Sequence, residues 1–124
     1  MYQTNYVRAK NTKDAVAKLN NEAMILAGGM TLIPSMKQLL SSPTNLIDIQ
    51  DINELKGIHK SENTIIVGAL TTHNEVANSQ IIKENISGLS YLASKIADNA
   101  VRNCGTLGGS ICNADPAADY PAAL

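Results

Sequence analysis

A glycine-rich segment near the end of the chain has the residue types of a ligand-binding loop. The segment GTLGGS, residues 105–110, combines three glycines with two hydroxyl side chains. Glycines let a backbone approach a ligand closely, and free backbone N–H groups at the start of a helix favour an anion such as phosphate. The alternative is a turn that needs glycine only for its positive φ. This segment alone does not decide between the two interpretations.

A second pair of glycines, Gly28 and Gly29, follows an apolar run and precedes a predicted helix start at Thr31. A strand that ends directly before a helix places free N–H groups and the positive end of the helix dipole at one point. The spacing fits neither the GxGxxG nor the GxxxxGK(S/T) phosphate loop, so a tight turn remains the alternative. Two such loops in one chain favour binding of a diphosphate flanked by two nucleoside-like halves.

Acidic and basic side chains flank the later loop. Asn113, Asp115 and Asp119 follow it, and carboxylates accept hydrogen bonds from ribose or ribityl hydroxyls. Asp115 stands directly before Pro116, which favours a helix N-cap, so we predict the binding role for Asp119. Arg102 could pair with a phosphate, a carboxylate or a partner subunit, or form a surface ion pair.

The other chemistry-bearing residues form no catalytic or metal-binding pattern. His59 and His73 are isolated, so solvated or capping roles are predicted for both. Cys104 and Cys112 lack the spacing of a metal-binding pair, and buried, inert thiols are predicted. The sequence therefore predicts no catalytic residue, no metal ligand and no iron–sulfur cluster site.

Composition indicates one globular chain of ordinary size. Its 124 residues are 44% hydrophobic and 17% charged, and without Phe or Trp the core must be built from aliphatic side chains and Met. A net charge of −1 argues against nucleic acid and anionic membranes as partners. No apolar run approaches the ~18 residues of a membrane helix. The N-terminus is not a signal peptide, and the cysteine usage predicts a reducing, cytoplasmic setting.

Apolar periodicity predicts strands that alternate with helices. The predicted strands cover residues 6–9, 23–27 (buried), 46–49, 58–60 and 64–67, the last two forming a hairpin with its tip at 62–63. The predicted helices cover residues 11–20, 31–40, 73–82 with a break near 78–79, and 87–96. From residue 98 onward only loops and short turns are predicted, apart from a helix start within 117–124. This order predicts an α+β fold with an α/β-like first half.

Taken together, these segments resemble the N-terminal part of the FAD-binding (medium) subunit of molybdenum hydroxylases, the family that includes xanthine dehydrogenase and carbon monoxide dehydrogenase. The matching segments run in family order over essentially the whole chain. They are AGGMTLIPSMK (27–37), LIDI (46–49), Glu54-Leu55 with Gly57-Ile58, IIVGALTTHNEV (65–76), IADNAVRNCGTLGGS (96–110) and NADPAADYPAAL (113–124). The last segment is more similar to the carbon monoxide dehydrogenase type than to purine enzymes.

The resemblance implies a two-subdomain FAD-binding fold of the vanillyl-alcohol oxidase type, with FAD between the subdomains. The first subdomain, residues 1–57, would hold the diphosphate through Ile25, Leu26, Ala27, Gly28, Gly29, Met30, Thr31 and Leu32. The second, residues 58–124, would hold it through Thr106, Leu107, Gly108, Gly109 and Ser110. Ile96 would touch the cofactor, and Asp119 would accept from a flavin-side hydroxyl. Met30 replaces a small polar residue common in the family, so only its backbone is expected to act.

The resemblance also implies a role in electron transfer. In this family the substrate is oxidised at a molybdenum cofactor on a large subunit. Electrons then pass through iron–sulfur clusters on a small subunit to FAD and on to an acceptor such as NAD or a quinone. FAD supplies the redox chemistry while the protein binds and orients it, so no proton-transfer catalyst is expected.

Family members are more than twice as long as this chain, so the second subdomain is expected to be incomplete. Such a chain would expose apolar surface, including part of Leu107, Ile111 and residues 122–124, and is expected to need a partner chain, to dimerise or to be only marginally stable. The residues leave two other functions open. One is an assembly module of this fold that holds no FAD, and the other is a nucleotide- or phosphate-binding module that uses the glycine loops without flavin.

Overall fold

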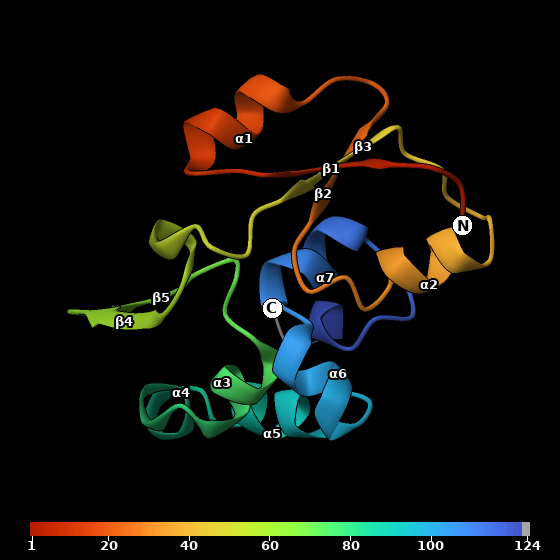
Figure 1. The fold of residues 1–124 in the computed structure, drawn as a ribbon. Coiled ribbons are helices and arrows are strands. Elements are labelled where there is room, and N and C mark those ends of the chain that lie inside the picture. The colour runs from red at the N-terminus through yellow and green to blue at the C-terminus, as the bar shows by residue number, and fades with distance from the viewer. Residues whose placement is uncertain (123–124) are drawn as a thin grey trace. The chain divides into compact units, whose positions relative to one another are not determined.

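The structure is a computed structural model that describes residues 1–122. The chain divides into two compact units, Met1–Glu54 and Leu55–Leu124. In Figure 1 the first unit carries a small sheet with its helices, and the second carries a hairpin and a series of short helices. No helix in the described range is long and apolar enough to cross a membrane.

The first unit is built on a three-stranded parallel sheet in the order β1-β3-β2. The strands are β1 (Asn5–Arg8), β2 (Ala23–Leu26) and β3 (Asn45–Asp48). Tyr6 of β1 and Met24 of β2 both stand opposite Leu46 of β3. Parallel strands need crossover connections, and these contain the helices α1 (Thr12–Lys18) and α2 (Leu32–Lys37).

Burial in the first unit follows position in the sheet. The core cluster consists of Leu26, Met36 and Leu46, with Leu32 and Ile33 packed against it. The central strand β3 buries its last three residues, whereas β2 lies at an edge. The prediction of a buried strand at 23–27 is therefore wrong for its middle, where Met24 and Ile25 are 44% and 43% exposed.

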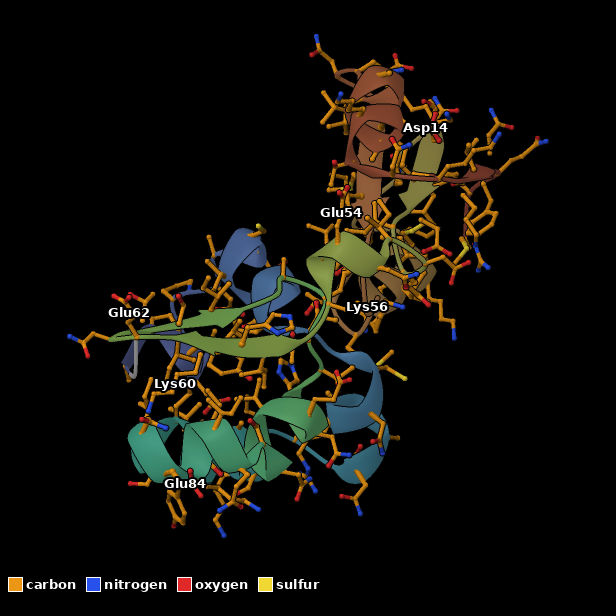
Figure 2. The ribbon with its side chains drawn as sticks, turned by 90° about the vertical axis from the view of Figure 1, so that its left-hand side faces the viewer. Asp14, Glu54, Lys56, Lys60, Glu62 and Glu84 are labelled. Carbon is orange, nitrogen blue, oxygen red and sulfur yellow. The ribbon has the colours of Figure 1, made fainter. Side chains whose placement is uncertain are left out.

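Side-chain hydrogen bonds hold α1 in place. Asn11 caps it by accepting from the Asp14 N–H at 2.8 Å, which the sequence predicts from residue type. Glu54, labelled in Figure 2, accepts from the backbone N–H of Thr12 at 3.1 Å and from its hydroxyl at 2.6 Å. The last residue of the first unit is thereby tied to the start of α1.

A 3-10 turn, η1 (Asn53–Leu55), stands at the division, and the second unit follows it. Its hairpin consists of β4 (Ile58–Ser61) and β5 (Thr64–Val67), paired antiparallel with Ile58 opposite Val67. Its helical elements in the described range are α3 (His73–Asn78), α4 (Gln80–Asn85), α5 (Ser87–Lys95), α6 (Asn99–Cys104), α7 (Leu107–Asn113) and the 3-10 turn η2 (Tyr120–Ala122). The buried core is formed by Val76, Ala77, Ile82, Leu89, Ala93, Leu107 and Tyr120. The Lys60 ammonium of β4, labelled in Figure 2, donates to Asn85 of α4 at 2.7 Å.

The predicted hairpin and the predicted helix break are both confirmed. Glu62 at the hairpin tip has a φ of 46°, as a tight turn requires. Ser79 ends α3 in an extended conformation and then caps α4 by accepting from the Ile82 N–H at 3.3 Å. One polar residue thus ends one helix and begins the next.

The prediction of only loops and short turns after residue 98 is wrong, because α6 and α7 occupy most of that stretch. Each helix begins at a side-chain cap, Asp98 accepting from Val101 N–H at 2.9 Å and Thr106 from Gly109 N–H at 3.1 Å. Glycine costs a helix about 1 kcal/mol relative to Ala, which made this segment look unfavourable. Packing outweighs that cost here. Of the helix expected within 117–124, the described part forms only η2, and residues 123–124 lie outside the described range.

Candidate functional site

The first glycine loop joins β2 to α2 and requires glycine at its second position. Gly29 has a φ of 72°, in the left-handed region that side chains other than glycine rarely adopt. A Cβ there would lie 2.9 Å from Leu26 Cδ1 and 3.0 Å from Ile33 Cγ1. The Gly29 carbonyl accepts the first hydrogen bond of α2, from Ile33 N–H at 3.0 Å. The loop is therefore shaped by both backbone conformation and close packing.

The backbone donors of this loop have no protein acceptor. Across the described part of the chain, none of the N–H groups from Gly28 to Leu32 donates a hydrogen bond. Thr31 is the N-cap of α2, but its side chain makes no capping bond and its backbone is αR rather than extended. Met30 and Thr31 are exposed. Adjacent free N–H groups at a helix start form a site for a phosphate group.

Residues just after β3 support this loop, and the sequence patterns did not reveal them. Gln50 Nε2 donates to the Ala27 carbonyl at 2.7 Å, and the Gln50 backbone N–H donates to Asp48 Oδ1 at 2.8 Å. The carboxyl ends of neighbouring parallel strands lie side by side, so the end of β3 reaches the loop that follows β2. The alternation of strands was the only sequence signal that could have pointed to Gln50.

Asp48 is buried at the end of β3 and anchors a polar network. Its carboxylate accepts from the Tyr6 hydroxyl and from Arg8 Nη2 at 3.0 Å, and Arg8 also pairs with Asp51 at 2.7 Å. Burial raises the pKa of Asp48, but hydrogen bonds from Tyr6, the Gln50 N–H and Arg8 outweigh it and lower the pKa below its usual value. The carboxylate therefore stays charged and fully bonded inside the first unit.

The second glycine loop begins α7, and its backbone donors from Leu107 to Ser110 are all used within the chain. The N–H groups of Leu107, Gly108, Gly109 and Ser110 donate respectively to Thr71 O (3.0 Å), Ala69 O (2.9 Å), Thr106 Oγ1 (3.1 Å) and Thr106 O (3.0 Å). What this loop can offer a ligand therefore lies in side chains. The half-buried Ser110 hydroxyl is the available group, since Thr106 is buried and its hydroxyl caps the helix.

Two glycines of this region are required by close packing. A Cβ at Gly108 would lie 2.6 Å from Ala69 Cβ and 2.7 Å from Ala69 O. A Cβ at Gly105 would lie 2.7 Å from His73 Nε2. Leu107 between them is 7% exposed and belongs to the core of the second unit, whereas Ile111 is 46% exposed. The expected apolar exposure is therefore wrong at Leu107 and confirmed at Ile111.

Ile96 and Arg102 meet at the turn between α5 and α6. Arg102 Nη1 donates to the carbonyls of Ile96 at 2.7 Å and Ala97 at 2.8 Å, and Nη2 donates to Asn99 Oδ1 at 2.6 Å. Ala97 has a positive φ of 43°, so the guanidinium holds an unusual backbone turn. Within residues 1–122 Arg102 forms no ion pair with a carboxylate, and its guanidinium donates to backbone carbonyls and to Asn99 instead.

Asp115 and Asp119 make different contacts in the structure. Asp115 Oδ1 accepts from the Ala117 N–H at 2.8 Å and caps a turn, although no helix follows. Asp119 is exposed, and its carboxylate has no hydrogen-bond partner in the described range. Asp119 stands beside the fully buried Tyr120, so its position is set by a neighbour in the core.

His73 is a buried residue of the second unit, and the prediction of a solvated or capping role is wrong for it. It is 5% exposed, and its Nδ1 lies 2.9 Å from the Tyr120 hydroxyl. Burial lowers the pKa of His73, and the nearby Asp119 carboxylate opposes this shift. Burial, with Asp119 adding to it, raises the pKa of the Tyr120 phenol. Both rings are therefore neutral at pH 7.

Both cysteines differ from the prediction of buried thiols. Cys104 and Cys112 are free and exposed, because each lies on the outer side of a short helix. Among residues 1–122, no group of three or more His, Cys, Asp or Glu side chains could hold a metal ion.

Comparison with known proteins places the chain in a family. Residues 2–124 match the model of the FAD binding domain in molybdopterin dehydrogenase. The chain is 40% identical over 121 residues to the glyceraldehyde dehydrogenase medium chain of Sulfolobus acidocaldarius, covering 96% of this chain and 43% of that protein. It is 41% identical over 120 residues to the carbon monoxide dehydrogenase medium chain of Hydrogenophaga pseudoflava, covering 94% of this chain and 42% of that protein. The chain thus spans less than half the length of these relatives.

Solved structures agree with the sequence matches. Carbon monoxide dehydrogenase from Hydrogenophaga pseudoflava matches with a TM-score of 0.95 and 40% identity over 98% of this chain and 43% of that chain. Quinoline 2-oxidoreductase from Pseudomonas putida 86 matches with a TM-score of 0.93 and 31% identity over 97% of this chain and 43% of that chain. The predicted family, the predicted fold class and the predicted cofactor, FAD, are confirmed. The chain belongs to the family of FAD-binding domains in molybdopterin dehydrogenase.

Proposed function

We propose that this chain is the FAD-binding part of the medium subunit of a molybdenum hydroxylase, and that its first glycine loop binds the FAD diphosphate. The observation that carries the proposal is the run of backbone N–H groups from Gly28 to Leu32 that lack a protein acceptor beside the positive φ of Gly29. A diphosphate would satisfy these donors, and glycine at position 29 allows the positive φ that shapes the loop.

The proposed contacts in the first unit extend along β2 into α2. Ile25 is exposed at the sheet edge, whereas Leu26 and Leu32 pack in the core and hold the loop ends. Ala27 is fixed through its carbonyl by Gln50. Met30 would contribute its N–H, since its side chain has no donor for a phosphate. The loop would therefore bind through its backbone rather than its side chains.

The proposed contacts in the second unit are of another kind. Ser110 offers a hydroxyl and Asp119 an unpaired carboxylate, both acceptors for hydroxyl or amine groups of the cofactor. Ile96, half-buried at the end of α5, offers an apolar contact. Thr106, Leu107, Gly108 and Gly109 would shape the backbone that carries Ser110.

FAD accepts and donates electrons when bound, and the chain's own residues bind and orient it. We propose that the electrons come from iron–sulfur clusters on a small subunit, after substrate oxidation at a molybdenum cofactor on a large subunit, and leave to an external acceptor. Relatives named for carbon monoxide, glyceraldehyde and quinoline match this chain with 31% to 41% identity. Because one segment serves proteins with such different substrates, substrate choice is proposed to lie outside it.

Flavin uptake by the purified chain tests the proposal. The 124-residue chain is incubated with FAD, separated from free cofactor, and its visible absorption spectrum is recorded. We expect one FAD per chain, with weaker binding of ADP, because ADP supplies the diphosphate but not the flavin side. A colourless protein would overturn the proposal and favour an assembly module without FAD. Binding of ADP with no binding of FAD would favour a nucleotide-binding module.

A further inference from the structure

The segment Ala69–His73 is joined to the start of α7 by backbone hydrogen bonds. Gly108 N–H donates to Ala69 O at 2.9 Å, Leu107 N–H to Thr71 O at 3.0 Å, and His73 N–H to Gly105 O at 3.0 Å. Thr72 and Thr106 form an isolated antiparallel bridge within this arrangement. The start of α3 and the start of α7 are therefore held together by backbone hydrogen bonds in both directions.

The imidazole of His73 links these two hydrogen-bonded segments to the segment that carries Asp119. One side of the ring packs against Gly105, where a Cβ would lie 2.7 Å from Nε2. On the other side, Nδ1 lies 2.9 Å from the Tyr120 hydroxyl, and the two ring centroids are 5.3 Å apart. His73 and Tyr120 are 5% and 0% exposed. The buried side chain of His73 thus contacts Gly105, just before the proposed cofactor contacts begin in sequence, and Tyr120, just after they end.

The chemistry of this pair suits a fixed position. Burial keeps both rings neutral, so the contact is a hydrogen bond between neutral groups rather than an ion pair. A neutral hydrogen bond of this kind holds direction as well as distance, since it needs one ring nitrogen aimed at the hydroxyl. Asp119 directly precedes Tyr120 in the chain, so the position of Tyr120 constrains where the Asp119 backbone lies.

We propose that His73 is a positioning residue for the cofactor: it holds Tyr120 and packs against Gly105, and so sets the Asp119 carboxylate relative to the loop Thr106–Ser110. This inference rests on the proposed function, because it assumes that Asp119 and this loop contact FAD. His73 is the first residue of α3, whose cap is Thr72, and forming this helix start does not require a contact with Tyr120, which is 47 residues away in sequence.

The variant Tyr120→Phe tests the inference, because it keeps the ring and removes only the hydroxyl. We expect its FAD dissociation constant to rise about fivefold, the size expected for one neutral hydrogen bond. The matched control is Ile82→Val, which shortens a fully buried residue of the same core. Both variants should lower the Tm by about 5 °C, but only Tyr120→Phe should weaken FAD binding.

Two variants of His73 separate positioning from packing. His73→Asn keeps an amide near the position of Nδ1 and should retain FAD affinity within about twofold, whereas His73→Leu keeps bulk and should lose about fivefold. The double variant His73→Leu with Tyr120→Phe should bind FAD no more weakly than either single variant, because both remove one contact.

The outcomes are distinguishable. If the unaltered chain takes up no FAD, the proposed function fails and this inference fails with it. If the unaltered chain binds FAD and both Tyr120→Phe and His73→Leu bind as tightly as Ile82→Val, the inference is overturned while the proposed function stands. If His73→Leu does not fold, Tyr120→Phe measured against Ile82→Val decides.

Discussion

The two glycine loops look alike in sequence but use their backbone donors in opposite ways. At Gly28–Leu32 the N–H groups have no acceptor in the described structure, and the cap residue Thr31 makes no capping bond. At Leu107–Ser110 every N–H donates to Thr71, Ala69 or Thr106. The N–H donors of the first loop are thus free to bind a ligand, whereas the second loop uses these donors in hydrogen bonds within the chain. A glycine-rich helix start is therefore a candidate phosphate site only where its N–H groups are not already bonded within the chain.

The two loops also differ in why they require glycine. Gly29 is required mainly by its positive φ, and the atoms near its missing Cβ belong to side chains that can move. Gly108 is required by Ala69, whose Cβ, carbonyl oxygen and Cα would lie 2.6, 2.7 and 2.8 Å from an added Cβ, and these atoms cannot move without shifting the backbone. Substitution should therefore affect ligand binding most at the first loop and folding most at the second.

The largest expected effect is on stability, from Gly108→Ala. The added methyl would meet Ala69 at 2.6 Å, so we expect the free energy of unfolding of the second unit to fall by about 3 kcal/mol. The control is Gly88→Ala in α5, where nothing lies within 4 Å and a gain of about 0.5–1 kcal/mol is expected. Urea denaturation measures both. Equal stability of the two variants would show that close packing on Ala69 does not require glycine at position 108.

The next effect is on affinity, from Gly29→Ala. A methyl at a φ of 72° costs about 1–2 kcal/mol and would reorient the free donors. Because hydrogen bonds to a charged phosphate are strong, we expect the FAD dissociation constant to rise about 10- to 100-fold, as measured by fluorescence quenching of the flavin. FAD binding unchanged in Gly29→Ala but lost in folded Gly108→Ala would reverse the roles that we assign to the two loops.

A smaller effect is expected from acidification, and it separates the two units. The lowered pKa of His73 means that the unfolded chain binds more protons, so the second unit loses stability as the pH falls below about 6.5. Because the pKa of Asp48 is lowered in the folded chain, the first unit loses stability only below about pH 4. Amide hydrogen exchange in α3 and β3 reports the two units separately. His73→Asn should remove the loss of stability that begins below about pH 6.5. If the first unit opened at a higher pH than the second, the assignment of these losses to His73 and Asp48 would be contradicted.

The smallest effect is expected from Gln50→Ala, which removes the bond to the Ala27 carbonyl. Gln50 is exposed, so the Tm should hardly change, while the FAD dissociation constant should rise about two- to fivefold from a less ordered loop. Calorimetric titration with FAD measures the change. Thr44→Ser serves as a control of similar exposure elsewhere in the first unit. An unchanged affinity would show that the loop holds its shape without Gln50.

Local signals in the sequence predicted most elements, because each depends on neighbours in the chain. Asn11 caps α1, Ser79 separates α3 from α4, and Glu62 turns the hairpin, each through its own backbone or a bond three residues away. The same reasoning failed after residue 98, where glycines argued against helix. The packing of Gly108 on Ala69 decides that helix, and it joins residues far apart in sequence.

Sequence patterns were enough to predict the order of elements up to α5, the two glycine loops and the family, because caps, periodicity and a run of matching segments are local properties. The tertiary structure alone decided which loop keeps free donors, that Gln50 supports the first loop, and that His73 and Tyr120 meet in the core. The physical reason is that a backbone N–H is free or used according to which distant carbonyl folding brings to it.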